Sequence, residues 1–251
     1  MRRAKPLAAM FVVSVGSVMF LSACKKAEAP THQATVTTTP AATATQAAIV
    51  LTQPRSGDQV TVPFAVKGTA SVFEGTVIVA VESADGSTTF CQTFTTASEG
   101  APGTGSFETQ IAFPPPSKAT DGRVRVYSES PKDGSVQNLV SVPIVISSEQ
   151  PAIVVESPLC GAEVKSPVTV SGTASVFEAA LVIVVKDSLG QELSRAEVLA
   201  SIGAPDRGTF SQDLSFSLPG GSEAGTIEAF STSARDGSII NLFSVPVTLT
   251  P

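Results

Sequence analysis

Short runs rich in Val, Ile, Thr and Phe follow one another from Ile49 onward, separated by Gly, Pro, Asp and Ser. In Phe107–Phe113 apolar and polar residues alternate, which is the period of a strand with one buried face. No helical period competes with this pattern. The segment 49–146 therefore predicts seven strands, at Ile49–Thr52, Val62–Thr69, Thr76–Glu82, Thr88–Thr95, Phe107–Phe113, Arg123–Ser128 and Leu139–Ile146.

The same pattern occurs a second time. Ile49–Glu74 aligns without gaps with Ile153–Glu178, and 14 of the 26 positions are identical, including the heptapeptide GTASVFE. Ser128–Pro143 likewise resembles Ser231–Pro246. A period of about 100 residues is too long for a solenoid repeat and matches two tandem domains. We therefore predict domains at 48–147 and 152–250, joined by a few residues.

Seven short strands with turn residues every 8–12 positions favour an antiparallel β-sandwich. Its core must consist of Phe, Val, Ile and Leu, because the chain has no Trp and Tyr127 is its single Tyr. This composition excludes the Cys–Trp–Cys core of antibody domains.

Three motifs of the second copy, SPVTVSGTASVFEA, GAPDRGTF and SARDGS, resemble the immunoglobulin-like domain of bacterial spore germination proteins. The first copy departs from the pattern at Gly75 and at Pro131-Lys132. The resemblance implies an all-β protein with two tandem immunoglobulin-like sandwiches, in an envelope lipoprotein that acts as a binding or adhesion module without known catalysis. It also implies a link to sporulation or germination, although the further domains of some relatives are missing here.

The N-terminus combines a basic start, an apolar run from Leu7 to Leu21 and the tetrapeptide Leu-Ser-Ala-Cys that ends at Cys24. This resembles the lipoprotein signal of bacteria, with cleavage between Ala23 and Cys24 and acyl chains on the Cys24 thiol. We therefore expect residues 1–23 to be a signal peptide. An uncleaved anchor, an ordinary secretory peptide and twin-arginine export are the alternatives. The expected location is the cell membrane or outer membrane, facing the periplasm or exterior, with the lipid anchor as the membrane contact.

Residues 24–47 follow as a lipidated N-terminus and a linker rich in Thr, Ala and Pro, which we expect to be disordered. The single histidine, His32, lies in this linker. Without residues 1–23 the chain keeps 13 basic and 22 acidic residues, a formal charge of −9. Such an acidic chain is a poor ligand for phosphate backbones, so no nucleic-acid partner is expected.

Four acidic residues in duplicated motifs are the candidate site residues. Glu74 and Glu178 follow Val-Phe pairs that we expect to enter the core, and their carboxylates either cap loop amides or form a recognition hook. Asp133 and Asp236 begin Asp-Gly-Ser motifs, which predict tight turns, with a calcium or sugar site as the alternative.

The sequence gives little support for catalysis or for metal or phosphate binding. The predicted domains contain no histidine, no GxSxG, no phosphate-binding glycine loop and no CxxC motif. We expect neither an enzyme nor a bound metal or cofactor. The function predicted is binding of an envelope glycan or protein, and the alternative is a spacer or a self-associating scaffold.

Two glycines and two cysteines remain. Gly68 and Gly172 are expected at strand ends, where the missing Cβ permits close backbone approach. The alignment sets Arg195 opposite Cys91 and Ser56 opposite Cys160, so neither cysteine belongs to the shared framework. Free thiols are favoured over a disulfide between the two domains.

Overall fold

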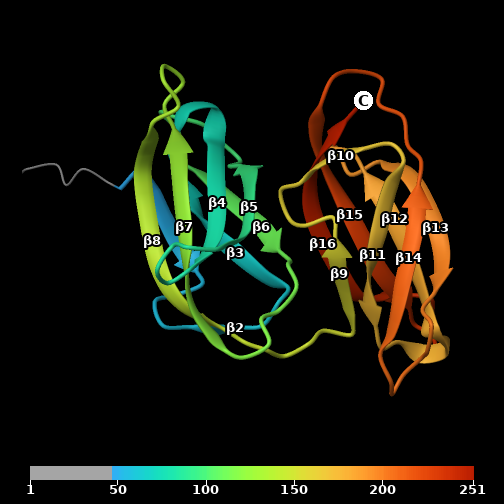
Figure 1. Ribbon diagram of the computed structural model, residues 1–251. Helices are drawn as coiled ribbons and strands as arrows, with labels where there is room; N and C mark the ends of the chain where they lie inside the picture. The colour runs from blue at the N-terminus through green and yellow to red at the C-terminus, as the bar shows by residue number, and fades with distance from the viewer. Residues whose placement is uncertain (1–46) are drawn as a thin grey trace, which may run out of the picture. The chain divides into compact units, whose positions relative to one another are not determined.

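The computed structural model describes residues 47–251, which form two β-sandwiches (Figure 1). Each sandwich packs a three-stranded sheet against a five-stranded sheet. The first contains β1 (Ile49–Gln53), β2 (Gln59–Val60), β3 (Phe64–Ala70), β4 (Thr76–Ser83), β5 (Thr89–Thr96), β6 (Gly105–Ile111), β7 (Thr120–Glu129) and β8 (Val136–Ile146). Every predicted strand of this sandwich is present, and the short β2 is the one strand of this sandwich that the pattern missed.

The second sandwich repeats this order. Its strands are β9 (Ile153–Ser157), β10 (Glu163–Lys165), β11 (Val168–Ala174), β12 (Ala180–Lys186), β13 (Glu192–Leu199), β14 (Gly208–Leu214), β15 (Glu223–Thr232) and β16 (Ile239–Thr250). Within residues 47–251 the helical segments are two three-residue 3₁₀ turns, η1 (Phe73–Gly75) and η2 (Phe177–Ala179). No helix in this part of the chain is long and apolar enough to cross a membrane.

In both sandwiches the N-terminal segment contributes to both sheets. β1 pairs antiparallel with β3 in the three-stranded sheet β1-β3-β6, whereas β2 pairs parallel with β8 at the edge of the sheet β2-β8-β7-β4-β5. The second sandwich has the orders β14-β11-β9 and β10-β16-β15-β12-β13, with β10 parallel to β16. All other pairs are antiparallel.

The inward faces of the two sheets form each core. In β4, Val77, Val79 and Val81 are fully buried at alternate positions. The largest fully buried side chains of the two sandwiches are all aliphatic residues or phenylalanines, led by Phe113 and Phe243. The prediction of a core built without tryptophan is confirmed.

The duplicated glycines permit close approach of neighbouring groups in the three-stranded sheets. A Cβ on Gly68 would lie 2.6 Å from Cζ of Phe107 and would also collide with the Val50 carbonyl. Gly172 has the same relation to Phe210 and the Val154 carbonyl. Close approach is thus confirmed, but the predicted place at a strand end is wrong, because each strand continues for two more residues.

A disulfide joins the two sandwiches, so the preference for free thiols was wrong. Cys91 in β5 is bonded to Cys160 in the turn after β9, with their Cα atoms 5.0 Å apart and a sequence separation of 69. The alignment could not reveal this bond, because neither cysteine has a counterpart in the other copy. By strand register, the residue of the second sandwich that is equivalent to Cys91 is Ser194, and not Arg195 as the sequence alignment predicted. Closing a loop of this length raises the free energy of the unfolded chain by about 4 kcal/mol in the entropic model, because it reduces the number of conformations that the chain can adopt.

Replacing Gly172 with alanine tests the close approach. The Gly172→Ala variant should lose about 3 kcal/mol of unfolding free energy, at the upper end of overpacking costs, because the methyl group meets backbone and a packed ring. Urea denaturation measures the loss. Gly220→Ala is the matched control, because a Cβ there meets nothing within 4 Å. Equal stability of the two variants would show that the sheet does not require a glycine here.

Candidate functional site

The duplicated motifs meet at one end of each sandwich. η1 lies between β3 and β4, and the hairpin that contains Asp133-Gly134-Ser135 lies between β7 and β8. Because β4 and β7 are antiparallel, with Ile78 opposite Tyr127, the start of β4 and the end of β7 share one end of the sheet. The same register in β12 and β15 brings η2 and the second Asp-Gly-Ser hairpin together. We call this the motif end of each sandwich.

Backbone hydrogen bonds fix the 3₁₀ turn at the motif end. The Gly75 amide donates to the Val72 carbonyl at 3.0 Å, and the Ala101 amide donates to the same carbonyl at 2.8 Å. The Ala97 amide donates to the Gly75 carbonyl at 2.8 Å. In the second sandwich the amides of Ala179 and Ala204 both donate to Val176. The loop after β5, or after β13, therefore holds the turn in place.

The phenylalanines of these turns are exposed, so the prediction that both residues of each Val-Phe pair enter the core was wrong. Val72 and Val176 are buried, but Phe73 is 59% exposed and Phe177 is 71% exposed. β3 and β11 end before the Val-Phe pairs, and the chain reverses direction at the glutamate that follows each pair. Only the valine of each pair therefore keeps the inward orientation.

The reversal depends on a left-handed backbone. Glu74 has φ 53° and Glu178 has φ 54°, a conformation that costs a residue with a Cβ about 1–2 kcal/mol. Ala179 is also left-handed, at φ 56°, where the first sandwich has Gly75. The N-cap residue of each turn is a valine, whose side chain makes no capping hydrogen bond. The assignment of the glutamates as caps of loop amides or as a recognition hook remains a prediction.

The motif end of the second sandwich is the more apolar. Leu199 is 74% exposed directly across the sheet from Ala180, and Ile202 is 46% exposed in the loop bonded to η2. Strand register and backbone hydrogen bonds identify the equivalent positions in the first sandwich, which hold the polar residues Thr96 and Glu99. We call Phe177, Leu199 and Ile202 the apolar patch.

The Asp-Gly-Ser hairpins are tight turns, as predicted. Asp133 Oδ1 accepts hydrogen bonds from the Ser135 hydroxyl at 2.7 Å and the Ser135 amide at 3.1 Å, and Gly134 has φ 70°. Asp236 and Ser238 make the same two bonds in the second hairpin. Bonds from the Ser135 and Ser130 hydroxyls lower the pKa of Asp133, and bonds from Ser238 lower that of Asp236. Each carboxylate is thus engaged by its own turn. Residues 47–251 contain no cluster of three or more metal-ligating side chains.

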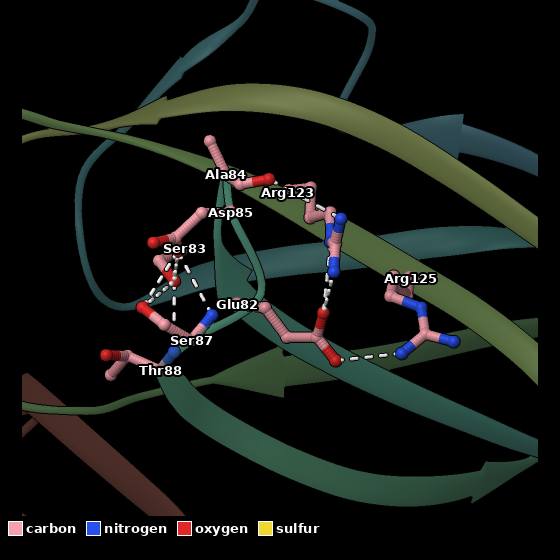
Figure 2. Close-up of polar contacts among 8 residues, drawn as sticks. All are labelled: Glu82, Ser83, Ala84, Asp85, Ser87, Thr88, Arg123 and Arg125. Carbon is pink, nitrogen blue, oxygen red and sulfur yellow. Dashed lines mark hydrogen bonds and ion pairs between the residues drawn. The ribbon is translucent and has the colours of Figure 1, made fainter.

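A second polar cluster lies on the outer face of the first five-stranded sheet (Figure 2). The buried carboxylate of Glu82 accepts hydrogen bonds from Arg123 Nη2 at 2.8 Å and from Arg125 Nη1 at 2.9 Å. Burial alone would raise the pKa of Glu82, but bonds and charge from the two arginines hold it below its usual range. This carboxylate stays ionised at neutral pH and is fully paired, which suits a structural role rather than proton transfer.

The turn beside this cluster is equally closed. Asp85 Oδ1 accepts bonds from the Ser83 hydroxyl at 2.6 Å, the Ser87 hydroxyl at 2.9 Å and the Ser87 amide at 3.0 Å. These bonds lower the pKa of Asp85 to about 2. Because this value lies below the unfolded pKa of about 3.9, the ionised turn stabilises the fold above that pH and loses its contribution as the pH falls toward 2.

The second sandwich keeps the ion pair with its charges exchanged. Lys186 occupies the position of Glu82, and Glu228 that of Arg125, with Nζ and Oε2 2.7 Å apart. Each sandwich also has an arginine over an aromatic ring on this sheet: Arg125, which belongs to the first ion pair, lies over Tyr127 at 5.5 Å, and Arg195 lies over Phe230 at 5.7 Å. Both sandwiches thus have a paired charge here, with the signs exchanged.

Sequence reasoning missed the exposed phenylalanines, the apolar patch and the exchanged ion pair. Hydrophobicity did not reveal the first, because the exposure of the phenylalanines depends on the left-handed backbone at Glu74 and Glu178. The predicted cleavage site at Ala23 and Cys24 lies outside the described residues. So does the predicted linker 24–47 with His32, except for residue 47. Both remain predictions.

The fold and its motif ends define a tandem immunoglobulin-like β-sandwich protein. The family model described as "Immunoglobulin-like domain of bacterial spore germination" (Gmad2) matches residues 48–135 and 152–238. The chain belongs to this family, with two tandem copies of its domain. A comparison with curated proteins found no match.

Solved structures with weak similarity include repeats of a large adhesion protein and a domain of a biofilm-associated protein. A tetra-tandem repeat from the extending region of a large adhesion protein has 20% identity and a TM-score of 0.27, with 74% of this chain and 45% of that chain covered. The BSP domain of a biofilm-associated protein has 18% identity and a TM-score of 0.25, with 80% and 29% covered. This chain therefore spans less than half of either structure. Fibronectin(III)-like modules of Clostridium thermocellum CbhA have 14% identity and a TM-score of 0.21, with 80% and 93% covered. Scores this low carry no weight for function.

Exchanging the ion pair tests whether its sign matters. Glu82→Lys should cost about 2 kcal/mol, because it sets a third cation beside two partly exposed arginines. The triple variant Glu82→Lys/Arg123→Thr/Arg125→Glu copies the second sandwich and should recover most of that loss. Thermal unfolding measures both. A triple variant no more stable than the single one would contradict the structural role.

Proposed function

We propose that this protein is a lipid-anchored component of the bacterial cell envelope that binds an envelope glycan or protein through its motif ends. One observation carries the proposal: both sandwiches display the same Phe-Glu pair in a left-handed turn, with the phenylalanine exposed. Residues kept between copies only for folding are expected to be buried or hydrogen-bonded. Phe73 and Phe177 are neither buried nor part of a core cluster.

Exposed aromatic residues on a rigid loop are suited to binding. They bring a large apolar area to an interface at little cost in conformational entropy, and such groups are frequent binding hot spots. The backbone bonds to the loop after β5 or β13 fix each turn in advance. The apolar patch of the second sandwich enlarges the contact area that Phe177 offers.

Two further observations support an exported, anchored protein. The Leu-Ser-Ala-Cys motif that ends at Cys24 is the sequence argument for the anchor. The Cys91–Cys160 disulfide fits an oxidising compartment outside the cytoplasm, where such bonds persist. The acidic charge speaks against nucleic acid as the partner. A germination role is the expectation that the family description brings.

A spacer or scaffold is the second candidate function. The observation that favours it is the covalent bond between the sandwiches, which limits their relative motion beyond what the short connection after β8 does. In that case the exposed phenylalanines would have no ligand.

Binding assays with phenylalanine variants test the proposal. Wild-type protein and a Phe73→Ser/Phe177→Ser variant are compared for retention on purified cell-wall glycan and on a detergent extract of envelope proteins. The double variant should bind at least tenfold more weakly to whichever fraction retains the wild type, since exposed aromatic anchors dominate such contacts.

Leu189→Ser is the matched control. Leu189 is 90% exposed but lies in the β12–β13 turn, at the opposite end of the second sandwich. Its loss should leave binding unchanged. If the wild type binds neither fraction, or if the control loses as much as the double variant, the motif ends are not a binding site.

A further inference from the structure

The two five-stranded sheets end on equivalent edge strands, β5 in the first sandwich and β13 in the second. An edge strand has a row of backbone groups without a partner in its own sheet, which another strand can pair with. Natural edge strands are usually protected against such pairing by charged side chains, bulges or a covering segment. The two edges of this protein are protected differently.

β13 is protected by charge. Its sequence ELSRAEVL contains Glu192, Arg195 and Glu197. β5 has the sequence TFCQTFTT and contains no charged residue. Strand register sets Gln92 where the second sandwich has Arg195, and Phe94 where it has Glu197. β5 is thus rich in residues with high strand propensity and has no electrostatic protection.

A turn of the second sandwich covers β5 instead. Cys160 is bonded to Cys91 of β5, and a Cβ on Gly161 would collide with the Gln92 carbonyl. The Gly161 amide donates to the Pro246 carbonyl at 2.8 Å, which fixes the turn to β16 of its own sandwich. The backbone of the turn therefore lies directly against the backbone of the edge strand. Neither cysteine has a counterpart in the other copy, and within residues 47–251 the charge-protected edge β13 has no such disulfide-linked cover.

We propose that the Leu159–Gly161 turn is an edge guard, and that β5 without this guard pairs with β5 of another molecule of the same chain. The pairing would be antiparallel and two-fold symmetric, so that each strand extends the five-stranded sheet of the other molecule. Antiparallel pairing of two TFCQTFTT strands opposes Thr, Phe and Gln side chains and no like charges. The partner is therefore the chain itself, and the inference does not depend on the ligand proposed above.

Sedimentation velocity of the full chain without residues 1–23, and with Cys24 replaced by serine, tests the proposal. The reference protein keeps Cys91 and Cys160 and should remain monomeric from about 1 to 100 µM. The Cys91→Ser/Cys160→Ser variant should form a dimer, with a dissociation constant at least tenfold lower than any the reference shows. Serine at both positions also prevents disulfides between molecules, so that any dimer is noncovalent.

The matched control gives β5 charge protection, as β13 has. Adding Gln92→Glu and Phe94→Glu to the cysteine-free variant should restore the monomer, because antiparallel pairing would bring the added like charges of the two strands together, while far-UV circular dichroism confirms that the sheets persist. A cysteine-free variant that stays monomeric would overturn the proposal. Dimerisation of the reference protein to the same extent, or a dimer that survives the two added charges, would overturn it as well.

Hydrogen exchange of the reference protein keeps the proposal testable if the cysteine-free variant does not fold. The backbone amide of Gln92 should exchange more slowly than that of Arg195, its counterpart in β13, because the turn lies against β5 at Gln92. Equal exchange of the two amides would show that β5 has no guard.

Discussion

The left-handed turn after each buried valine is the constraint on which the candidate site depends. Val72 and Val176 anchor the turn in the core, and the reversal at Glu74 or Glu178 then directs the phenylalanine between them away from the core. Hydrogen bonds from the following loop hold this unfavourable backbone in place. A rigid exposed aromatic residue is the result, and it occurs once in each sandwich.

The two sandwiches differ most where the fold permits alternatives. The outer sheet face needs a neutralised charge, so Glu82 with its arginines and Lys186 with Glu228 are equivalent solutions. The edge of the same sheet needs protection, and charges on β13 and a disulfide-linked turn on β5 both fit that need. By contrast, the glycine, the buried valine and the Phe-Glu turn are identical in both copies. What both copies keep is therefore a structural frame together with an exposed group that the frame does not use.

Local pattern predicted most of the fold, because alternation and turn residues act within a few positions along the chain. The strands, the all-β class and the Asp-Gly-Ser turns depend on such local rules. Phe73 was assigned to the core because hydrophobicity alone does not reveal a backbone at φ > 0. The Cys91–Cys160 bond was missed because it depends on the contact between the two domains. Comparing the two repeats cannot reveal it, because neither cysteine has a counterpart in the other copy. The Glu82 pairs depend on strand register in the same way.

Solvent exposure of the phenylalanine rings tests the central claim most directly, and it requires no ligand. In NMR spectra of the full chain with labelled phenylalanine, a soluble paramagnetic probe should strongly broaden the ring signals of Phe73 and Phe177. The buried rings of Phe107 and Phe210 should be little affected. If the rings of Phe73 and Phe177 are as protected as those of Phe107 and Phe210, the turns do not display them, and the account of the motif ends is wrong.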